Sequence, residues 1–225
     1  AVAAGAPITV GGNTFATFWI VPNASDLSTA TYPVSIDPTG TISGTTAIDD
    51  NMINSAAANN NNGAATSLPV RGGGATWQIP ITRIDKALIP NGTISAARWF
   101  AYATSGGAAH STYRIKPANT WVEGASINAL ETGASCYNYA ITATQAWAGS
   151  AGCRTSGTDY DAGASDTQSL GVGVWKTWAL TASWLSDWRD SLHVNNGIVL
   201  HWTSGATTAG AINPSDAASL AAYFE

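Results

Sequence analysis

Charged side chains are scarce in this chain of 225 residues. Only 10% of its residues are Asp, Glu, Lys or Arg, against roughly 25% in an ordinary soluble domain. The nine cations are scattered and the net charge is -5, so the clustered Lys and Arg that contact a phosphate backbone are missing. Nucleic acid is therefore not expected as a partner. The polar surface must consist mainly of Ser, Thr, Asn and Gly, which suits an extracellular or particle-bound protein better than a cytosolic enzyme.

Long hydrophobic runs are missing as well. No run approaches the ~20 apolar residues that a membrane-spanning helix needs, so no membrane insertion is expected. The start of the chain, Ala1 to Gly5, lacks the charged region and apolar run of a signal peptide. We expect either removal of an initiator Met or an earlier cleavage of a leader, and the sequence leaves both open.

Cysteine is limited to Cys136 and Cys153, which lie in a segment rich in Gly, Ala, Ser and Thr. In an oxidising setting the two could form a disulfide that contributes ~3 kcal/mol by restricting the unfolded chain. The alternative is two free thiols that never meet. His110, His193 and His201 stand far apart in the sequence, and together with two cysteines they make no zinc-binding spacing.

Recognisable catalytic motifs are missing too. Glu123 and Glu131 are the only internal glutamates, and a glycosidase needs two carboxylates that face each other across a cleft. Neither lies in a known motif, and the serines lack a Gly-x-Ser-x-Gly elbow followed by an acid and a histidine. The sequence therefore predicts a protein that is not an enzyme and uses no cofactor.

What the chain does contain is β-strand patterning. Residues 77–102 read as one strand, a loop closed by Pro90-Asn91-Gly92, and a second strand from Thr93. Apolar residues alternate with others in both strands, as in half-buried β-strands. The alternating positions are Trp77, Ile79 and Ile81, then Ala97, Trp99, Ala101 and Ala103.

Three further segments stand out. One helix is expected after Thr181, because Trp184, Leu185, Trp188 and Leu192 fall on one face at helical spacing. Residues 1–45 form an N-terminal extension with expected strands at 15–21 and 32–36, and residues 124–170 form a long excursion.

Taken in order, residues 46–225 resemble the DNRLRE domain family, jelly-roll β-sandwiches related to an alginate-binding carbohydrate-binding module. The matching pieces are Ile48-Asp-Asp-Asn with Asn62-Gly63 and Leu68, residues 78–102, Tyr113-Arg-Ile115 with Trp121-Val-Glu-Gly124, Trp175-Lys-Thr-Trp178 with the Trp188 helix, and Asn196-Gly-Ile-Val-Leu200. The resemblance implies an all-β jelly-roll sandwich without catalytic activity, as found in secreted polysaccharide-binding proteins and phage particle proteins. It also places Glu123 in a turn, where a structural hydrogen bond is the expected role.

The excursion holds the candidate carbohydrate-binding residues, because aromatic rings stack on sugar rings while nearby polar groups orient the hydroxyls. These candidates are Tyr137, Tyr139, Trp147 and Tyr160. The alternative is that they pack the excursion onto the sandwich. Residues 49–51 and 159–161 offer oxygen ligands for calcium, but paired acids in turns are usually solvated or act as caps, so no metal site is predicted.

Hydrophobic residues on both faces of one strand give the candidate assembly contact. If Trp99 and Ala101 face the core, Phe100 and Tyr102 face outward, where a lone sandwich would carry polar residues. Either the N-terminal extension covers this second face, which is the more economical alternative, or another subunit does. Residues Phe15, Phe18 and Trp19 of the extension complete the candidate contact set.

These observations favour a structural protein of a phage particle, a decoration of the capsid or a tail-associated subunit at the virion surface. Its expected partners are other particle subunits or further copies of itself, with a polysaccharide as an additional ligand. The alternative function is a freestanding, secreted carbohydrate-binding module or adhesin.

Overall fold

The computed structural model describes residues 40–73, 75–202 and 209–225, and within residues 1–39 it describes the backbone of four short strands. The chain divides into two compact units, Ala1–Thr39 and Gly40–Glu225, which are considered separately. No helix in the described part of the chain is long and apolar enough to cross a membrane.

The first unit contains two antiparallel strand pairs. β1 (Val2–Ala4) pairs with β4 (Phe18–Ile20), and β2 (Ile8–Val10) pairs with β3 (Asn13–Phe15). The strand expected at 15–21 is thus divided between the last residue of β3 and β4. The strand expected at 32–36 lies outside the described residues.

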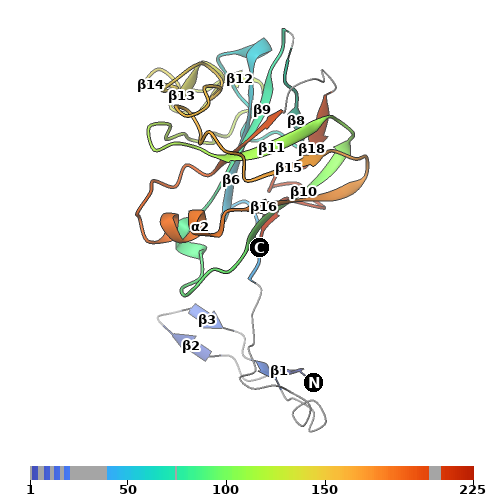
Figure 1. Ribbon diagram of the computed structural model, residues 1–225, viewed down its shortest axis with the longest axis vertical. Helices are drawn as coiled ribbons and strands as arrows, with labels where there is room; N and C mark the ends of the chain where they lie inside the picture. Colours follow the sequence, from blue (N-terminus) through green and yellow to red (C-terminus); the bar gives the residue numbers. More distant parts are fainter. Residues whose placement is uncertain are drawn as a thin grey trace. The chain divides into compact units, whose positions relative to one another are not determined.

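The second unit is a β-sandwich built of two antiparallel sheets (Figure 1). The five-stranded sheet has the order β15-β11-β17-β9-β6. Its strands are β6 (Ile48–Asn54), β9 (Gln78–Ile84), β11 (Ala109–Arg114), β15 (Asp166–Ser169) and β17 (Ile198–Trp202).

The six-stranded sheet has the order β5-β19-β10-β18-β8, with β16 on the other side of β10. Its strands are β5 (Ile42–Ser43), β8 (Leu68–Val70), β10 (Ala97–Ser105), β16 (Val174–Leu180), β18 (Gly210–Ile212) and β19 (Tyr223–Phe224). The chain alternates between the sheets so that β8-β18-β10-β16 opposes β9-β17-β11-β15, the strand order of a jelly roll. The predicted all-β fold is confirmed.

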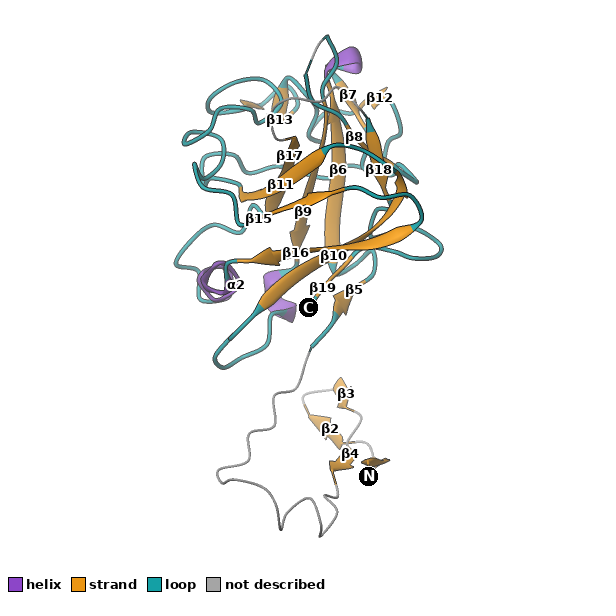
Figure 2. Ribbon diagram, turned by 45° about the vertical axis from the view of Figure 1, so that its right-hand side comes forward, coloured by secondary structure: helices purple, strands orange, loops and turns teal. Residues whose placement is uncertain are grey.

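The two strands of residues 77–102 belong to different sheets (Figure 2). β9 lies between β6 and β17, and both of its faces are buried, so the expectation of a half-buried strand is wrong there. β10 begins at Ala97 rather than Thr93, because a 3-10 helix (Lys86–Leu88), capped by Asp85, and an irregular stretch carry the chain from one sheet to the other. β10 alternates buried and more exposed residues as expected.

The main core lies between the sheets and is rich in tryptophan. Trp99 and Trp178 pack with their ring centroids 4.8 Å apart, and both are fully buried. α2 (Ala182–Arg189) begins after Thr181 as predicted and adds Trp184, Leu185 and Trp188 to this core. Leu192 lies beyond the helix and is 71% exposed, so its expected place on the buried face is wrong.

A second core lies on the outer face of the five-stranded sheet, called the covered face below. The connection 115–165 between β11 and β15 covers it and includes the excursion expected at 124–170. This connection contains β12 (Ala129–Leu130), which pairs with β7 (Asn60–Asn61), and the pair β13 (Tyr139–Ile141) and β14 (Gln145–Ala146). The second core consists of Ile53, Ile79, Ile81, Ile115, Trp121, Ala140, Trp147, Cys153 and Val199.

Candidate functional site

The outer face of the six-stranded sheet carries a continuous group of aromatic side chains, called the aromatic face below. Phe100 stacks on Tyr223 with ring centroids 4.5 Å apart and planes within 6°. Trp175 makes edge contacts with both Tyr102 at 5.6 Å and Tyr223 at 5.5 Å. Trp175 is 41% exposed, and Phe100, Tyr102 and Tyr223 are half-buried. The group therefore presents aromatic surface where an isolated sandwich would carry polar residues.

Strand register explains why these four residues meet. On β10, Tyr102 lies opposite Trp175 of β16, and Phe100 lies opposite Tyr223 of β19. Residues opposite each other in neighbouring strands point to the same face. The alternation in β10 had already indicated that Phe100 and Tyr102 face outward. Trp175 and Tyr223 were not singled out in the sequence, since the pairing of β10 with β16 and β19 has no local signal.

The rim of the aromatic face is polar and close to neutral. Arg98 and Glu225 form an ion pair of 3.0 Å at one end. Thr177 lies beside Phe100, and Ser43 lies beside Tyr223 in the sheet register. Such hydroxyl groups next to aromatic rings provide hydrogen bonds without charge.

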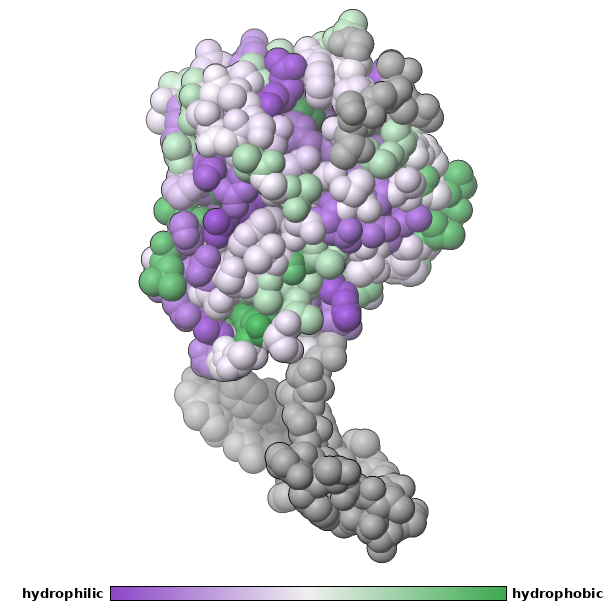
Figure 3. Space-filling model, viewed as in Figure 1, coloured by the Kyte–Doolittle hydropathy of each residue, from purple (hydrophilic) through white to green (hydrophobic). Residues whose placement is uncertain are grey.

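Figure 3 shows a different distribution of side chains over one side of the molecule. On that side of unit Gly40–Glu225, hydrophobic residues lie in small groups separated by polar ones. Single exposed apolar residues of this kind are normal on a soluble protein and indicate no binding site. They include Ile127, Leu130, Val172 and Leu192.

The candidate carbohydrate-binding residues of the excursion lie in or beside the second core. Trp147 is only 5% exposed and its indole N–H donates to the carbonyl of Cys136 at 3.0 Å. Tyr137 is buried as well, whereas Tyr139 and Tyr160 are half-buried. Tyr160 packs against His201 at 4.6 Å. Packing, the alternative considered from the sequence, describes Trp147 and Tyr137, which expose too little ring surface to stack on a sugar.

Cys136 and Cys153 are free and buried, so the disulfide is not formed in this structure. The Cys136 thiol accepts a hydrogen bond from the Thr142 hydroxyl at 3.4 Å. Burial raises the pKa of Cys153 well above its usual value, which keeps that thiol protonated and unreactive.

A carboxylate holds the excursion together where a disulfide was considered. Asp159 is fully buried and accepts backbone N–H groups from Gly149 at 2.7 Å, Ser150 at 3.0 Å and Thr155 at 2.7 Å. The side-chain amide of Asn119 donates to the same carboxylate at 3.3 Å. Hydrogen bonds to a charged acceptor are stronger than neutral ones. The sequence placed this aspartate in a possible calcium motif and did not reveal its structural role.

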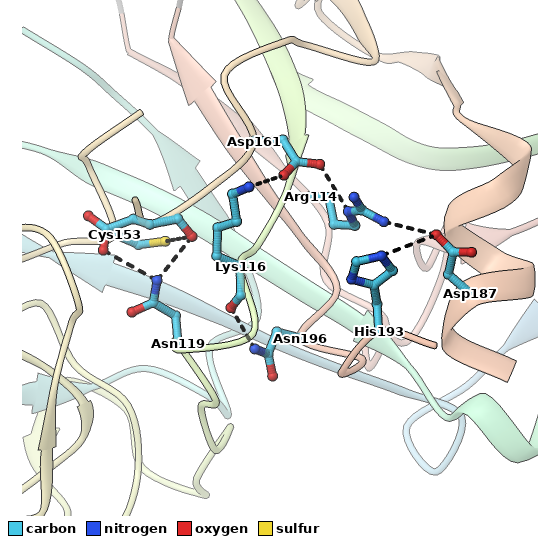
Figure 4. Close-up of polar contacts among 9 residues, drawn as sticks. Arg114, Lys116, Asn119, Cys153, Asp161, Asp187, His193 and Asn196 are labelled. Atoms are coloured by element: carbon cyan, nitrogen blue, oxygen red, sulfur yellow. Dashed lines mark hydrogen bonds and ion pairs between the residues drawn. The ribbon is translucent and has the colours of Figure 1, made fainter. Parts of the chain in front are cut away.

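Charged residues also join the excursion to the helix (Figure 4). Arg114 forms ion pairs with Asp161 at 2.9 Å and Asp187 at 3.1 Å, and Lys116 pairs with Asp161 at 3.0 Å. His193 lies 3.9 Å from the same Asp187 carboxylate. Each acidic group in this network already has a cationic partner, which favours a structural role over catalysis.

The two internal glutamates make separate local contacts. Glu123 accepts the backbone N–H of Asp50 at 2.7 Å, the structural hydrogen bond expected for it. Glu131 accepts the backbone N–H of Ala125 at 2.9 Å, and a hydrogen bond from Ser126 lowers its pKa. Burial raises the pKa of Glu123 to about 8. The structure gives no sign that the two carboxylates face each other across a cleft.

An open cleft of about 550 Å³ lies near the start of the helix-to-strand turn. It contains both acidic and basic residues, but the Arg83 guanidinium is occupied by Asp49 and by the carbonyl of Trp121. Lys86 donates to the Ser191 hydroxyl at 3.0 Å. The lining is Thr46, Asp49, Arg83, Ile84, Asp85, Lys86, Ser191, His193, Val194 and Asn195.

The histidines do not form a metal site. Burial lowers the pKa of both His110 and His201 to about 4, so both are neutral near pH 7. In residues 40–73, 75–202 and 209–225, no group of three or more His, Cys, Asp and Glu side chains is placed to hold a metal ion.

The side chains of Phe15, Phe18 and Trp19 lie outside what the structure describes; the backbone places Phe15 in β3 and the other two in β4. Comparisons of the chain with models of known protein families and with curated proteins gave no match. The resemblance to DNRLRE domains therefore remains a prediction that rests on the quoted motifs.

Proposed function

We propose that the protein is a non-catalytic structural subunit of a phage particle that assembles through its aromatic face. The observation that carries this proposal is the exposed cluster of Phe100, Tyr102, Trp175 and Tyr223. Exposed aromatic residues are enriched at the buried centres of protein interfaces and supply much of their binding energy. The DNRLRE-like pattern supports the same class, because such domains occur in phage particles.

A second copy of the chain is the proposed occupant of the aromatic face. The Arg98–Glu225 pair contributes no net charge to the rim, so two identical faces can meet without the repulsion that a rim of one sign would cause. A two-fold contact also requires a surface that is complementary to itself. The aromatic rings can interleave in such a contact, and the pair at one end can exchange partners with the pair of the other copy.

Light scattering after size-exclusion chromatography tests the assembly proposal. The full chain should associate in a concentration-dependent manner, and the double variant Phe100→Ser, Trp175→Ser should remain a monomer with an unchanged far-UV spectrum. Leu192→Ser is the matched control, because it removes an exposed apolar residue outside the aromatic face. A wild-type chain that is monomeric at high concentration, or a double variant that associates normally, would contradict the proposal.

Glycan adhesion is the second candidate function, as a freestanding carbohydrate-binding module or in addition to assembly. The uncharged hydroxyls of Ser43 and Thr177 beside Tyr223 and Phe100 favour it, since sugar sites combine a ring platform with a few polar groups. A pull-down on neutral and anionic polysaccharides should show retention that Trp175→Ala abolishes. The absence of retention on a broad panel would remove this candidate.

A further inference from the structure

Acidic side chains gather at the free edge of β6, on the side away from β9. Asp50 of β6 is 2% exposed. Its Oδ2 accepts the backbone N–H of Ser215 at 2.6 Å, whereas its Oδ1 accepts no hydrogen bond from any residue that the structure describes. A buried carboxylate oxygen without a partner is costly, because the charge it carries has lost its water.

The Glu123 carboxylate lies beside Asp50, held by the hydrogen bond from the Asp50 backbone N–H at 2.7 Å. Burial raises the pKa of Asp50 to about 6 and that of Glu123 to about 8. The carboxylates of Asp49 and Asp216 add to both shifts. The nearby cation, Arg83, is bound to Asp49, so it does not neutralise the Asp50–Glu123 pair.

Two physical solutions exist for such a pair near neutral pH. The carboxylates can share protons, or a cation can bind between them. Hard oxygen ligands select calcium or magnesium, and calcium accepts irregular sets of carboxylate, carbonyl and water oxygens, whereas magnesium demands a near-octahedral set. The position at an edge, with Asp216 exposed on the outer side, leaves room for water ligands.

We propose that Asp50 Oδ1 and the Glu123 carboxylate bind a calcium ion at the edge of β6. Two carboxylates are fewer than a tight calcium site uses, so the affinity belongs with the weak sites of extracellular modules, with dissociation constants of roughly 0.1–1 mM. The Asp216 carboxylate favours the ion through its charge, and water completes the coordination.

The ion would join three segments that are distant in the sequence. These are β6, the turn that contains Glu123, and the segment that begins at Asn213 and leads into β19. The last segment is tied to β6 by Ser215, whose hydroxyl donates to the carbonyl of Ile48 at 3.2 Å. Because β19 carries Tyr223, the calcium site would also support one side of the aromatic face.

Thermal unfolding of the full chain at pH 7.5 tests the proposal. After removal of metals with EDTA and dialysis, addition of CaCl2 to about 10 mM should raise Tm by about 3 °C or more, since an ion that binds the native state stabilises it by mass action. Glu123→Gln should abolish this rise. Asp166→Asn, at the opposite edge of the same sheet, is the control and should keep it.

Calorimetric titration with CaCl2 measures the binding directly and should give one site per chain that Glu123→Gln removes. Asp50→Asn should act in the same way, and if it does not fold, Glu123→Gln decides alone because that side chain is only half-buried. Two results would overturn the proposal. One is an unchanged Tm with calcium in the wild-type chain, which assigns protons to the pair. The other is a calcium response that persists in Glu123→Gln, which places the ion elsewhere.

Discussion

The outer faces of the two sheets are both rich in aromatic residues, yet only one is covered by the described part of its own unit. On the covered face, Trp121 and Trp147 lie within the second core. On the aromatic face, Trp175 is 41% exposed. Hydrophobic content alone therefore does not decide which face of a sheet becomes buried.

Buried polar groups account for the difference between the two faces. The side-chain amide of Asn51 in β6 donates to the carbonyl of Ser135 at 3.0 Å and to its hydroxyl at 2.7 Å. Asn61 donates to the same carbonyl at 2.9 Å. These contacts satisfy the backbone of the excursion, which a long loop needs before it can lie on a sheet. The polar groups of the aromatic face instead stay at its rim.

The largest expected effect separates two tryptophans, one from each face. Trp121 is fully buried, donates to the carbonyl of Asn196 at 2.8 Å, and lies 4.8 Å from the Arg83 guanidinium. Trp121→Ala should reduce the free energy of unfolding by about 3–5 kcal/mol through lost burial and a cavity. Trp175→Ala should cost about 1 kcal/mol or less, because its ring is already partly in water.

Denaturant unfolding of the two variants measures this contrast. Because both substitutions remove the same side chain, intrinsic differences between residue types cancel. Equal losses of stability would mean that the aromatic face is as much a part of the folded core as the covered face.

The next effect concerns the carboxylate that organises the excursion. Asp159→Asn keeps the shape of the side chain but replaces one acceptor oxygen by a donor, facing backbone N–H groups that also donate. We expect a loss of about 2–3 kcal/mol, since hydrogen bonds to a charged group are among the stronger ones. Chemical denaturation gives the magnitude, and hydrogen exchange should show the loss of protection at residues 149–155. Unchanged protection there would remove the anchoring role of Asp159.

A smaller effect should appear as a pH dependence at the edge of β6. The pKa of Glu123 in the folded chain is raised to about 8, above the ordinary value of about 4.3 in an unfolded chain. The folded state therefore holds its proton more tightly, and the stability present at low pH is lost as pH rises toward 8. In metal-free buffer, Tm should fall between pH 6 and pH 8 in the wild-type chain and change less in Glu123→Gln. Parallel curves would show that Glu123 does not cause the fall.

The smallest expected effect is that of a reducing agent on the covered face. Because Cys136 and Cys153 are free, dithiothreitol should leave Tm unchanged, and Cys136→Ser should respond as the wild-type chain does. A disulfide across a loop of this length would contribute about 3 kcal/mol. A marked drop in Tm on reduction, confirmed by loss of titratable thiol pairs, would show that the bridge forms.

The sequence predicted those features that depend on local patterns. Alternation in residues 97–103 indicated the outward direction of Phe100 and Tyr102, and helical spacing placed Trp184 and Trp188 in the core. Leu192 followed the same spacing, but the helix ends at Arg189 and the chain turns before that residue. Periodicity identifies the face of an element and does not fix its last turn.

Features that depend on contacts between distant residues were not predictable in this way. Trp147 was considered for sugar binding because its composition and neighbours suit that role. The structure instead packs it against the sheet, through contacts such as Asn51 to Ser135 that span 84 residues. The joining of Trp175 and Tyr223 to Phe100 likewise depends on the order of strands in the sheet, which no short motif specifies.

β19 places its two residues on opposite sides of the sheet, with Tyr223 in the aromatic face and Phe224 in the main core. This strand follows every other strand of both sheets along the chain. During synthesis it leaves the ribosome after all of them. The stacked pair of Phe100 and Tyr223 can therefore form only when the sandwich is nearly finished, which would keep unfinished nascent chains from presenting a complete association surface to their neighbours on the same messenger RNA.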